Sequence, residues 1–201
     1  MEITLLDRFG NEIGPAKGSK AGGLLVALGN AAFDEAVDRG NVYVAANQTT
    51  VTTQAGLSVT TPALTIANTP FSGKTVKIWY VSAVSLVAPV AAAAIWATLG
   101  GYSSTAVTAT TPATVRNMKT GDGSEPPGVR LLAVATLPAA PVAIGQLGAQ
   151  LTAAITTAPL GAFYERWYNG ALRIAPGFNF SIQTSTASTL FCEYILEVVD
   201  L

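Results

Sequence analysis

The segment TLFCEYILEVV, at residues 189–199, is the most regular strand in the sequence. Successive side chains of a strand point to opposite faces, so the alternate residues from Cys192 to Val198 share one face. The alternate residues from Glu193 to Val199 share the other face, which carries two carboxylates. We expect the Cys192 face to pack on the protein core, because that face has no charged side chain.

The residues before this strand predict two more strands joined by a tight turn. Residues 171–182 read ALRIAPGFNFSI, with Pro176 and Gly177 between two apolar runs. Proline presets a negative φ and glycine accepts a positive φ, which is what a tight turn requires. The C-terminal part of the chain is therefore predicted to be β structure.

Similar short runs recur from residue 41 onward, with turn residues between them. The candidate strands are residues 42–46, 49–53, 57–60, 64–67, 74–86, 91–99, 106–110, 130–135, 161–167, 172–174, 178–183 and 189–199. This spacing is typical of an all-β sandwich or barrel. Residues 119–128, KTGDGSEPPG, are predicted to form an exposed loop because they are polar and rich in glycine and proline.

The N-terminal residues differ in composition from the rest. Charged residues are frequent before residue 40, whereas Lys74 and Lys77 are the only ones between residues 40 and 115. We predict an N-terminal arm at residues 1–22, with a short strand at residues 3–6, and a β domain at residues 23–201. One short helix is predicted at residues 24–37.

Composition excludes several classes of chemistry. Only 11% of the 201 residues are charged, the net charge is -1, histidine is absent and Cys192 is the single cysteine. Histidine-dependent catalysis, imidazole metal sites, zinc fingers and an internal disulfide are therefore excluded. Scattered basic residues argue against nucleic acid as a partner. Residues 81–99 lack charge, but Pro89 and the missing basic flanks argue against a membrane span.

The acidic residues offer weak candidates for catalysis or metal binding. Glu193 and Glu197 are four residues apart on one strand face, roughly 13 Å, which is too wide for a glycosidase pair. Glu165 could pair with one of them across strands. Asp34, Glu35 and Asp38 do not match a calcium loop. We interpret these carboxylates as solvated, and we expect no enzyme activity, no cofactor and no metal.

The densest aromatic cluster is FYERWY, at residues 163–168. On a strand, Phe163 and Trp167 face one way and Tyr164 and Tyr168 face the other. A sheet with apolar residues on both faces is covered on both sides. These four aromatic residues are therefore predicted to lie at an interface between subunits, while a platform for stacking sugars or bases is the alternative.

Several segments together resemble a known class of viral proteins. They are residues 42–48 (VYVAANQ), 54–58 (QAGLS), 61–65 (TPALT), 72–74 (SGK), 78–82 (IWYVS), 91–96 (AAAAIW), 176–177 (PG) and 197–199 (EVV). The set is similar to the capsid decoration, or cement, proteins of tailed double-stranded DNA bacteriophages, which have a jelly-roll body. The resemblance covers most of residues 40–201 and lies in composition rather than in a chemical motif.

The resemblance implies a jelly-roll β-sandwich that forms a homotrimer on the outer capsid surface of the virion. The partner would be the major capsid protein, whose subunit contacts the trimer would stabilise. The protein would be made in the host cytoplasm, consistent with an N-terminus that lacks a signal-peptide pattern. We predict that the arm contacts the capsid through Leu5, Arg8, Phe9, Lys17 and Lys20. The alternative function is a receptor- or carbohydrate-binding head of a phage fibre or spike.

Overall fold

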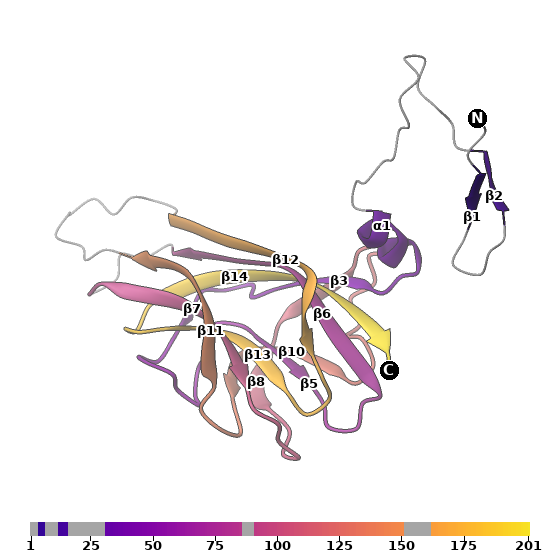
Figure 1. Cartoon of the computed structure of the whole chain (residues 1–201). Helices are drawn as coiled ribbons and strands as arrows, with labels where there is room; N and C mark the ends of the chain where they lie inside the picture. Colours follow the sequence, from indigo (N-terminus) through magenta and orange to yellow (C-terminus); the bar gives the residue numbers. More distant parts are fainter. Residues whose placement is uncertain (1–3, 7–11, 16–30, 86–90, 151–161) are drawn as a thin grey trace. The chain divides into compact units, whose positions relative to one another are not determined.

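The computed structural model describes residues 4–6, 12–15, 31–85, 91–150 and 162–201 (Figure 1). The chain divides into two compact units, Met1–Glu35 and Ala36–Leu201. In the first unit, β1 (Thr4–Leu6) pairs antiparallel with β2 (Glu12–Pro15). The strand predicted at residues 3–6 is thus confirmed, and β2 was missed. The predicted boundary between residues 22 and 23 lies outside the described residues.

The helix α1 (Ala31–Asp38) is shorter than the predicted helix at residues 24–37, of which residues 24–30 lie outside the described part of the chain. Its three acidic residues, Asp34, Glu35 and Asp38, are exposed. Within the second unit, the chain leaves the helix through a turn in which the Gly40 amide donates to the Val37 carbonyl. Among the described residues, no helix is long and apolar enough to span a membrane.

The second unit is an all-β sandwich of two antiparallel sheets, which form the upper and lower layers in Figure 1. The upper sheet has the order β12-β6-β14-β3-β9, and β4 also pairs with β14. Its strands are β3 (Val42–Ala46), β4 (Val51–Thr52), β6 (Lys74–Ser85), β9 (Thr114–Asn117), β12 (Ala162–Ile174) and β14 (Thr189–Asp200). The long β14 lies near the middle of this sheet, as the regularity of its sequence suggests.

The lower sheet has the order β11-β7-β13-β5-β10-β8. Its strands are β5 (Thr65–Asn68), β7 (Ala93–Gly100), β8 (Thr108–Pro112), β10 (Val129–Thr136), β11 (Val142–Gln150) and β13 (Asn179–Thr184). A single residue, Ala113, separates β8 in the lower sheet from β9 in the upper sheet. The chain therefore passes directly from one layer to the other at this edge, and the Ala113 amide donates to the Leu131 carbonyl at 2.8 Å.

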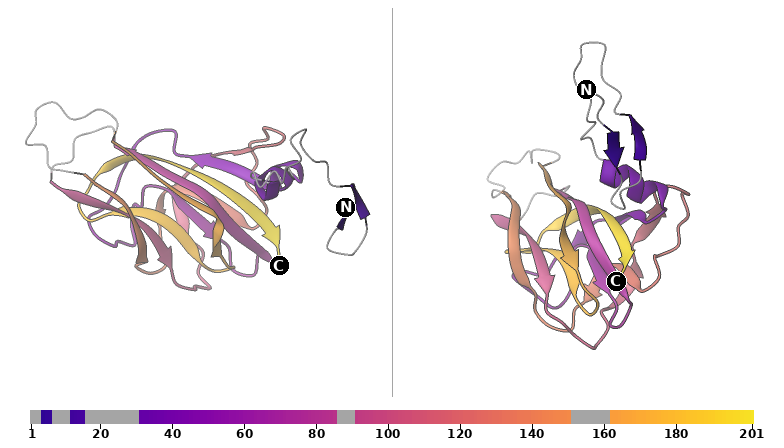
Figure 2. Two further views of the ribbon diagram at one scale, coloured as in Figure 1. Left: turned by 45° about the horizontal axis from the view of Figure 1, so that its top comes forward. Right: turned by 45° about the vertical axis from the view of Figure 1, so that its right-hand side comes forward.

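The main core lies between the two sheets, which face each other across it (Figure 2). The predicted inner face of β14 is confirmed, because Cys192, Tyr194, Leu196 and Val198 are all buried in this core. The Tyr194 ring meets the Phe180 ring of the lower sheet edge-on, with centroids 5.5 Å apart. Its hydroxyl donates to the Leu64 carbonyl at 2.7 Å, so this one side chain joins both layers.

Most predicted strands are confirmed within two residues, with three informative exceptions. Residues 57–60 form no strand, although Thr60 makes an isolated bridge to Thr136. The strands β9 and β11 were not predicted. The two runs predicted at residues 161–167 and 172–174 are one strand, β12, which is interrupted by a bulge where Asn169 and Gly170 take positive φ.

Candidate functional site

The aromatic residues of β12 alternate as the sequence predicts. Phe163 and Trp167 lie on the outer face of the upper sheet and are 55% and 53% exposed. Tyr164 and Tyr168 are half-buried and pack against the main core from the inner face. Burial raises the pKa of both tyrosines. The two exposed rings are therefore available to a partner, whereas the two tyrosines support the fold of the chain itself.

The strand register aligns further apolar residues with these two rings. Trp167 lies opposite Tyr80 of β6, Tyr80 lies opposite Ile195 of β14, and Ile195 lies opposite Val44 of β3. A second row is formed by Phe163, Val84 and Phe191. Val44, Val84, Phe191 and Ile195 are each half-buried. The outer face of the upper sheet thus presents two apolar rows that cross several strands.

An acidic row lies between the two apolar rows. Glu165 of β12 and Glu193 of β14 both lie opposite Ser82 of β6, one on each side. The two carboxylates are thus separated by two strand spacings, roughly 10 Å between backbones. The sequence left open whether Glu165 pairs across strands with Glu193 or Glu197. In the structure Glu165 lies in the same row as Glu193, but β6 separates the two residues.

The Tyr80 side chain connects the acidic row to the apolar row beside it. Its ring lies 4.6 Å from the Trp167 ring, between centroids, and its hydroxyl donates to Glu165 Oε2 at 3.0 Å. Burial raises the pKa of Tyr80, and the hydrogen bond to Glu165 raises that pKa further. Because the Tyr80 phenol remains protonated, it holds Glu165 in place beside the exposed Trp167 ring.

The interpretation of all strand carboxylates as solvated is wrong for Glu197. This side chain is on the same outer face, but the residue is only 6% exposed. Both of its carboxylate oxygens accept hydrogen bonds from Lys77 Nζ at 3.1 Å, and Trp79 Nε1 donates to one of them at 3.3 Å. A buried carboxylate needs such partners to remain charged. Glu197 is therefore a structural residue of the sheet.

The outer face of the lower sheet combines buried polar side chains with a second, smaller apolar cluster formed by Ala67, Val107, Leu132, Ala135 and Leu137. Gln183 is 2% exposed, and its amide group donates to the Ser58 carbonyl and accepts from the Ser58 amide, both at 2.8 Å. Thr98 Oγ1 donates to the Ser181 carbonyl at 2.9 Å. Residues 58–61 contact this sheet through the Ser58–Gln183 hydrogen bonds and through single backbone contacts with β10 at Thr136 and its neighbours, and the strand predicted at residues 57–60 is absent.

One end of the sandwich carries a strained and exposed aromatic residue, Phe71. It lies between β5 and β6, is 88% exposed and has a φ of 61°. The Ser72 amide donates to the Thr69 carbonyl at 3.2 Å, and Pro70 fixes the first central position. This is a type II turn, in which the second central position usually holds glycine because it needs a positive φ. A phenylalanine there has a conformational cost and contributes little to the core.

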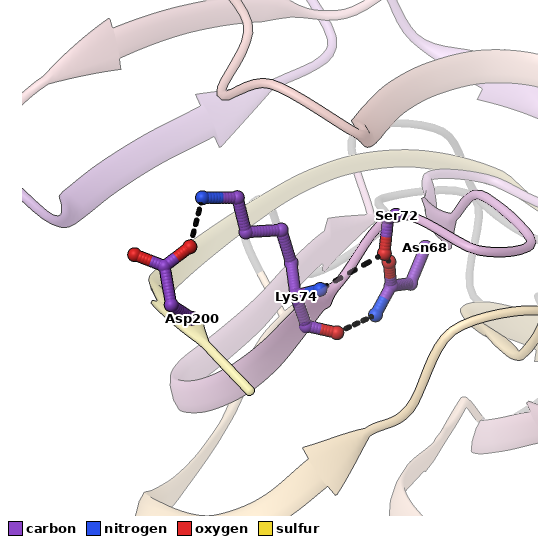
Figure 3. Close-up of polar contacts among 4 residues, drawn as sticks. All are labelled: Asn68, Ser72, Lys74 and Asp200. Carbon is purple, nitrogen blue, oxygen red and sulfur yellow. Dashed lines mark hydrogen bonds and ion pairs between the residues drawn. The ribbon is translucent and has the colours of Figure 1, made fainter.

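The Phe71 turn is held firmly despite this strain, and Figure 3 shows the contacts. The Asn68 amide nitrogen donates to the Lys74 carbonyl at 2.8 Å, and Asn68 Oδ1 accepts from Ser72 Oγ at 2.6 Å. The same nitrogen also donates to the Ile174 carbonyl of β12 at 2.9 Å. Lys74 also forms an ion pair with Asp200 of β14. The turn is therefore fixed to two neighbouring strands, β12 and β14.

The structure places the predicted arm residues only in part. Leu5 lies in β1, whereas Arg8, Phe9, Lys17 and Lys20 lie outside the described residues. Cys192 is a free cysteine, and burial raises the pKa of its thiol. No group of three or more potential metal ligands occurs within the described ranges. The predicted capsid contacts of the arm remain predictions.

Sequence reasoning missed Phe71 and the outer residues of β3, β6 and β14. A signal was present for the second group: β6 contains the run IWYVSAV, which is apolar at almost every position rather than at every second one. Such a run indicates a strand covered on both faces. Phe71 carried a weaker signal, a bulky residue between proline and Ser72-Gly73.

Comparisons of the chain with protein-family models, with curated proteins and with solved structures found no match.

Proposed function

We propose that this chain is a structural virion protein that binds the outer surface of a bacteriophage capsid and stabilises contacts between major capsid protein subunits. The observation that carries the proposal is the apolar outer face of the upper sheet, with Phe163 and Trp167 exposed on it. An extended apolar surface of this kind is typical of a site for protein contacts. It suits a protein that acts by assembly.

A jelly-roll topology for the sandwich is part of this proposal. With β8 to β10 set aside as an insertion and β4 taken as a continuation of β3, the remaining order is β3-β14-β6-β12 in one sheet and β5-β13-β7-β11 in the other. In chain order, β3, β5, β6 and β7 alternate between the upper and lower sheets, starting in the upper sheet. The next four strands, β11, β12, β13 and β14, alternate in the reverse sense, starting in the lower sheet. Two successive Greek keys produce this mirrored order, which supports the jelly-roll interpretation.

The position at which the N-terminal residues join the sandwich also supports the proposal. The Val198 amide donates to the Asn41 carbonyl at 2.9 Å, so the chain enters β3 near the C-terminal end of β14. Asp200 at that end pairs with Lys74 beside the Phe71 turn. The chain segment that leads into β3 and the exposed Phe71 thus lie at the same end of the sandwich, which we assign as the end that faces the capsid.

Binding to empty capsid shells of the phage that encodes the chain tests this function. The purified chain is mixed with shells lacking it, and bound protein is measured after sedimentation. We expect saturable binding that is lost when residues 1–20 are deleted, and equally lost when those residues are scrambled at constant composition. The absence of binding by the intact chain contradicts the function, and binding by the deleted chain contradicts the role of the arm.

A receptor- or carbohydrate-binding head is the second candidate, and one observation favours it. The exposed Trp167 ring lies beside the Tyr80–Glu165 hydrogen bond, which gives a stacking surface next to a fixed carboxylate. A glycan array probed with the intact chain tests this candidate. Specific binding that is lost in Trp167→Ala but kept in Phe71→Ala supports it, because Phe71 is an even more exposed aromatic residue elsewhere on the sandwich.

A further inference from the structure

Phe71, in the turn between β5 and β6, is the most exposed of the large apolar residues that the structure describes. A single exposed apolar side chain is common on protein surfaces and needs no special reason. The unusual feature of Phe71 is its backbone, because a φ of 61° is an outlier for a bulky residue. Such strain persists only where the surrounding structure holds it, and it gathers at functional sites. The ring therefore has a conformational cost without burial in its own chain.

The residues around the turn hold this strained conformation in place. Besides the hydrogen bonds of the buried Asn68 (Figure 3), two more fix the turn to its neighbours. Thr69 Oγ1 donates to the Gly128 carbonyl at 2.8 Å. The Leu201 amide donates to the Gly73 carbonyl at 2.9 Å. The turn thus presents the ring from a fixed backbone, so little conformational freedom is lost when a partner binds it.

A second exposed ring, Tyr102, is connected to the same turn. It lies over Gly177, where a Cβ atom would be 2.5 Å from the Tyr102 ring. The Gly177 amide donates to the Asn68 carbonyl at 2.9 Å, so Asn68 joins the support of Tyr102 to the turn of Phe71. The Tyr102 ring also packs against the Phe178 ring, with centroids 6.0 Å apart. Connected turns therefore present two exposed aromatic rings at this end of the sandwich.

The cavity among these turns is too small to receive a side chain of a partner. It is lined by residues that include Asn68, Pro70, Thr105, Gly177 and Asn179, and its volume is about 10 Å³. That volume is the space for about one water molecule. At this place the chain therefore supplies the side chain that enters, and the partner supplies the pocket.

We infer that Phe71 is a preformed anchor that inserts into an apolar pocket of the capsid protein, with Tyr102 in the same contact. A few buried aromatic anchors carry most of the binding energy of a typical protein interface. A pocket of fixed shape requires a ring in one position, whereas a fluid lipid surface accepts it in many and gains nothing from the strain. The anchor rests on the proposed function and deepens it, because it names the residue that enters the partner.

Binding of the purified full chain to capsid shells that lack it tests the anchor. We expect Phe71→Ala to weaken binding by about 30-fold or more, as at a hot spot. Phe71→Leu should weaken it less, because leucine fills part of the pocket, and Tyr102→Ala should also have a smaller effect than Phe71→Ala. Circular dichroism of each variant confirms that it is folded.

Leu57→Ala is the matched control, because Leu57 is an exposed apolar residue at the other end of β13. The Gly56 amide donates to the Thr184 carbonyl at that end, whereas Asn68 contacts the chain just before β13 begins. Leu57→Ala should bind shells as the wild type does. A loss in Leu57→Ala that equals the loss in Phe71→Ala would overturn the anchor, since the effect would not depend on position.

A photo-reactive ring identifies what surrounds the anchor. A full chain that carries p-benzoylphenylalanine in place of Phe71 is irradiated on the shells, and mass spectrometry locates the cross-links. We expect cross-links to apolar residues of the capsid protein. Cross-links only to another copy of the chain overturn the assigned partner. Sedimentation of the wild type, but not of Phe71→Ala, with phosphatidylglycerol vesicles, in the absence of cross-links to the capsid protein, overturns it in favour of a membrane.

Two outcomes separate the anchor from the proposed function. Shell binding by the wild type that persists unchanged in Phe71→Ala overturns the anchor and leaves the function standing. A wild-type chain that does not bind shells contradicts the function, and the partner assigned to the anchor falls with it.

Discussion

The outer faces of the two sheets differ in what covers them. On the lower sheet, buried Gln183 forms hydrogen bonds with Ser58 and Thr98 with Ser181, and a small apolar cluster around Leu132 is buried on the same face. On the upper sheet, the apolar rows that contain Trp167 and Ile195 remain partly exposed next to the residues that the structure describes. The backbone donors and acceptors of a covering segment must be satisfied, and on the lower sheet the Gln183 side chain satisfies both the amide and the carbonyl of Ser58. An apolar face suits side chains that arrive from another molecule.

The first prediction concerns the two hydrogen bonds between Gln183 and Ser58 on the outer face of the lower sheet. Gln183→Ala leaves the Ser58 amide and carbonyl without their partners, and we expect the free energy of unfolding to fall by about 2–4 kcal/mol. Urea denaturation measures the change. Gln146→Ala is the control, because Gln146 is exposed on the neighbouring strand pair and should change stability by less than about 0.5 kcal/mol. Equal effects of the two substitutions would show that the cover contributes little.

The second prediction compares the two faces of β6 within the upper sheet. Val81 is fully buried on the inner face and Val84 is half-buried on the outer face. Val81→Thr places a hydroxyl in the core and should cost about 1–3 kcal/mol of unfolding free energy. Val84→Thr should cost less than about 1 kcal/mol in dilute, monomeric protein. A large loss from Val84→Thr under these conditions would mean that the outer face is already covered within one chain.

The third prediction concerns the core that both sheets share. Burial raises the pKa of the Tyr194 hydroxyl well above its usual value of 10.0, and it also raises that of the Cys192 thiol above 9.0. Both groups keep their protons in the folded chain at a pH where the unfolded chain loses them. Stability is therefore unaffected below about pH 9 and then falls as the pH rises, by about 1.4 kcal/mol per pH unit for each group.

Tyr194→Phe identifies the share of the tyrosine in this alkaline loss. The variant loses the hydrogen bond to the Leu64 carbonyl, so it should be less stable than wild type by about 1 kcal/mol at pH 7. Above pH 10 its stability should fall less steeply, because one fewer proton is released on unfolding. Urea titrations between pH 7 and pH 11 measure both effects. Parallel curves for the two proteins above pH 10 would contradict the assignment to Tyr194.

Local sequence pattern predicted the regular parts of this fold. The alternation in β14 and the aromatic alternation in β12 depend only on the two-residue period of a strand, and both are confirmed. The strand β11 escaped prediction because Gly145 and Gly148 interrupt its pattern at two register shifts. At these positions a Cβ atom would meet Arg166 and Tyr164, so the glycines allow β11 to approach β12. That requirement arises from a neighbour distant in sequence.

On the outer face of the upper sheet, only the residues of β12 were predicted from the sequence. The rest of this surface also depends on neighbours that are distant in sequence. The residues of β12 were found because four aromatic residues lie within six consecutive positions. Ile195, Val44 and Tyr80 come from three other strands, and only the register places them beside Trp167. Residues 57–60 were interpreted as a strand because an alternating segment looks the same whether it pairs in a sheet or covers one.

The final and smallest effect concerns Phe71, the exposed apolar residue at the end of the sandwich. Its positive φ costs a residue with a Cβ about 1 kcal/mol, whereas glycine adopts this conformation freely. Phe71→Gly should therefore raise the free energy of unfolding by about 0.5–1 kcal/mol, and Phe71→Ala should leave it nearly unchanged because alanine keeps the Cβ atom. Both variants lack the ring, so both should bind capsid shells more weakly if this end faces the capsid. If the free energy of unfolding rises only in Phe71→Gly while shell binding falls equally in both variants, the positive φ affects stability and the ring contributes to binding. Unchanged shell binding in both variants would remove this end of the sandwich from the contact surface.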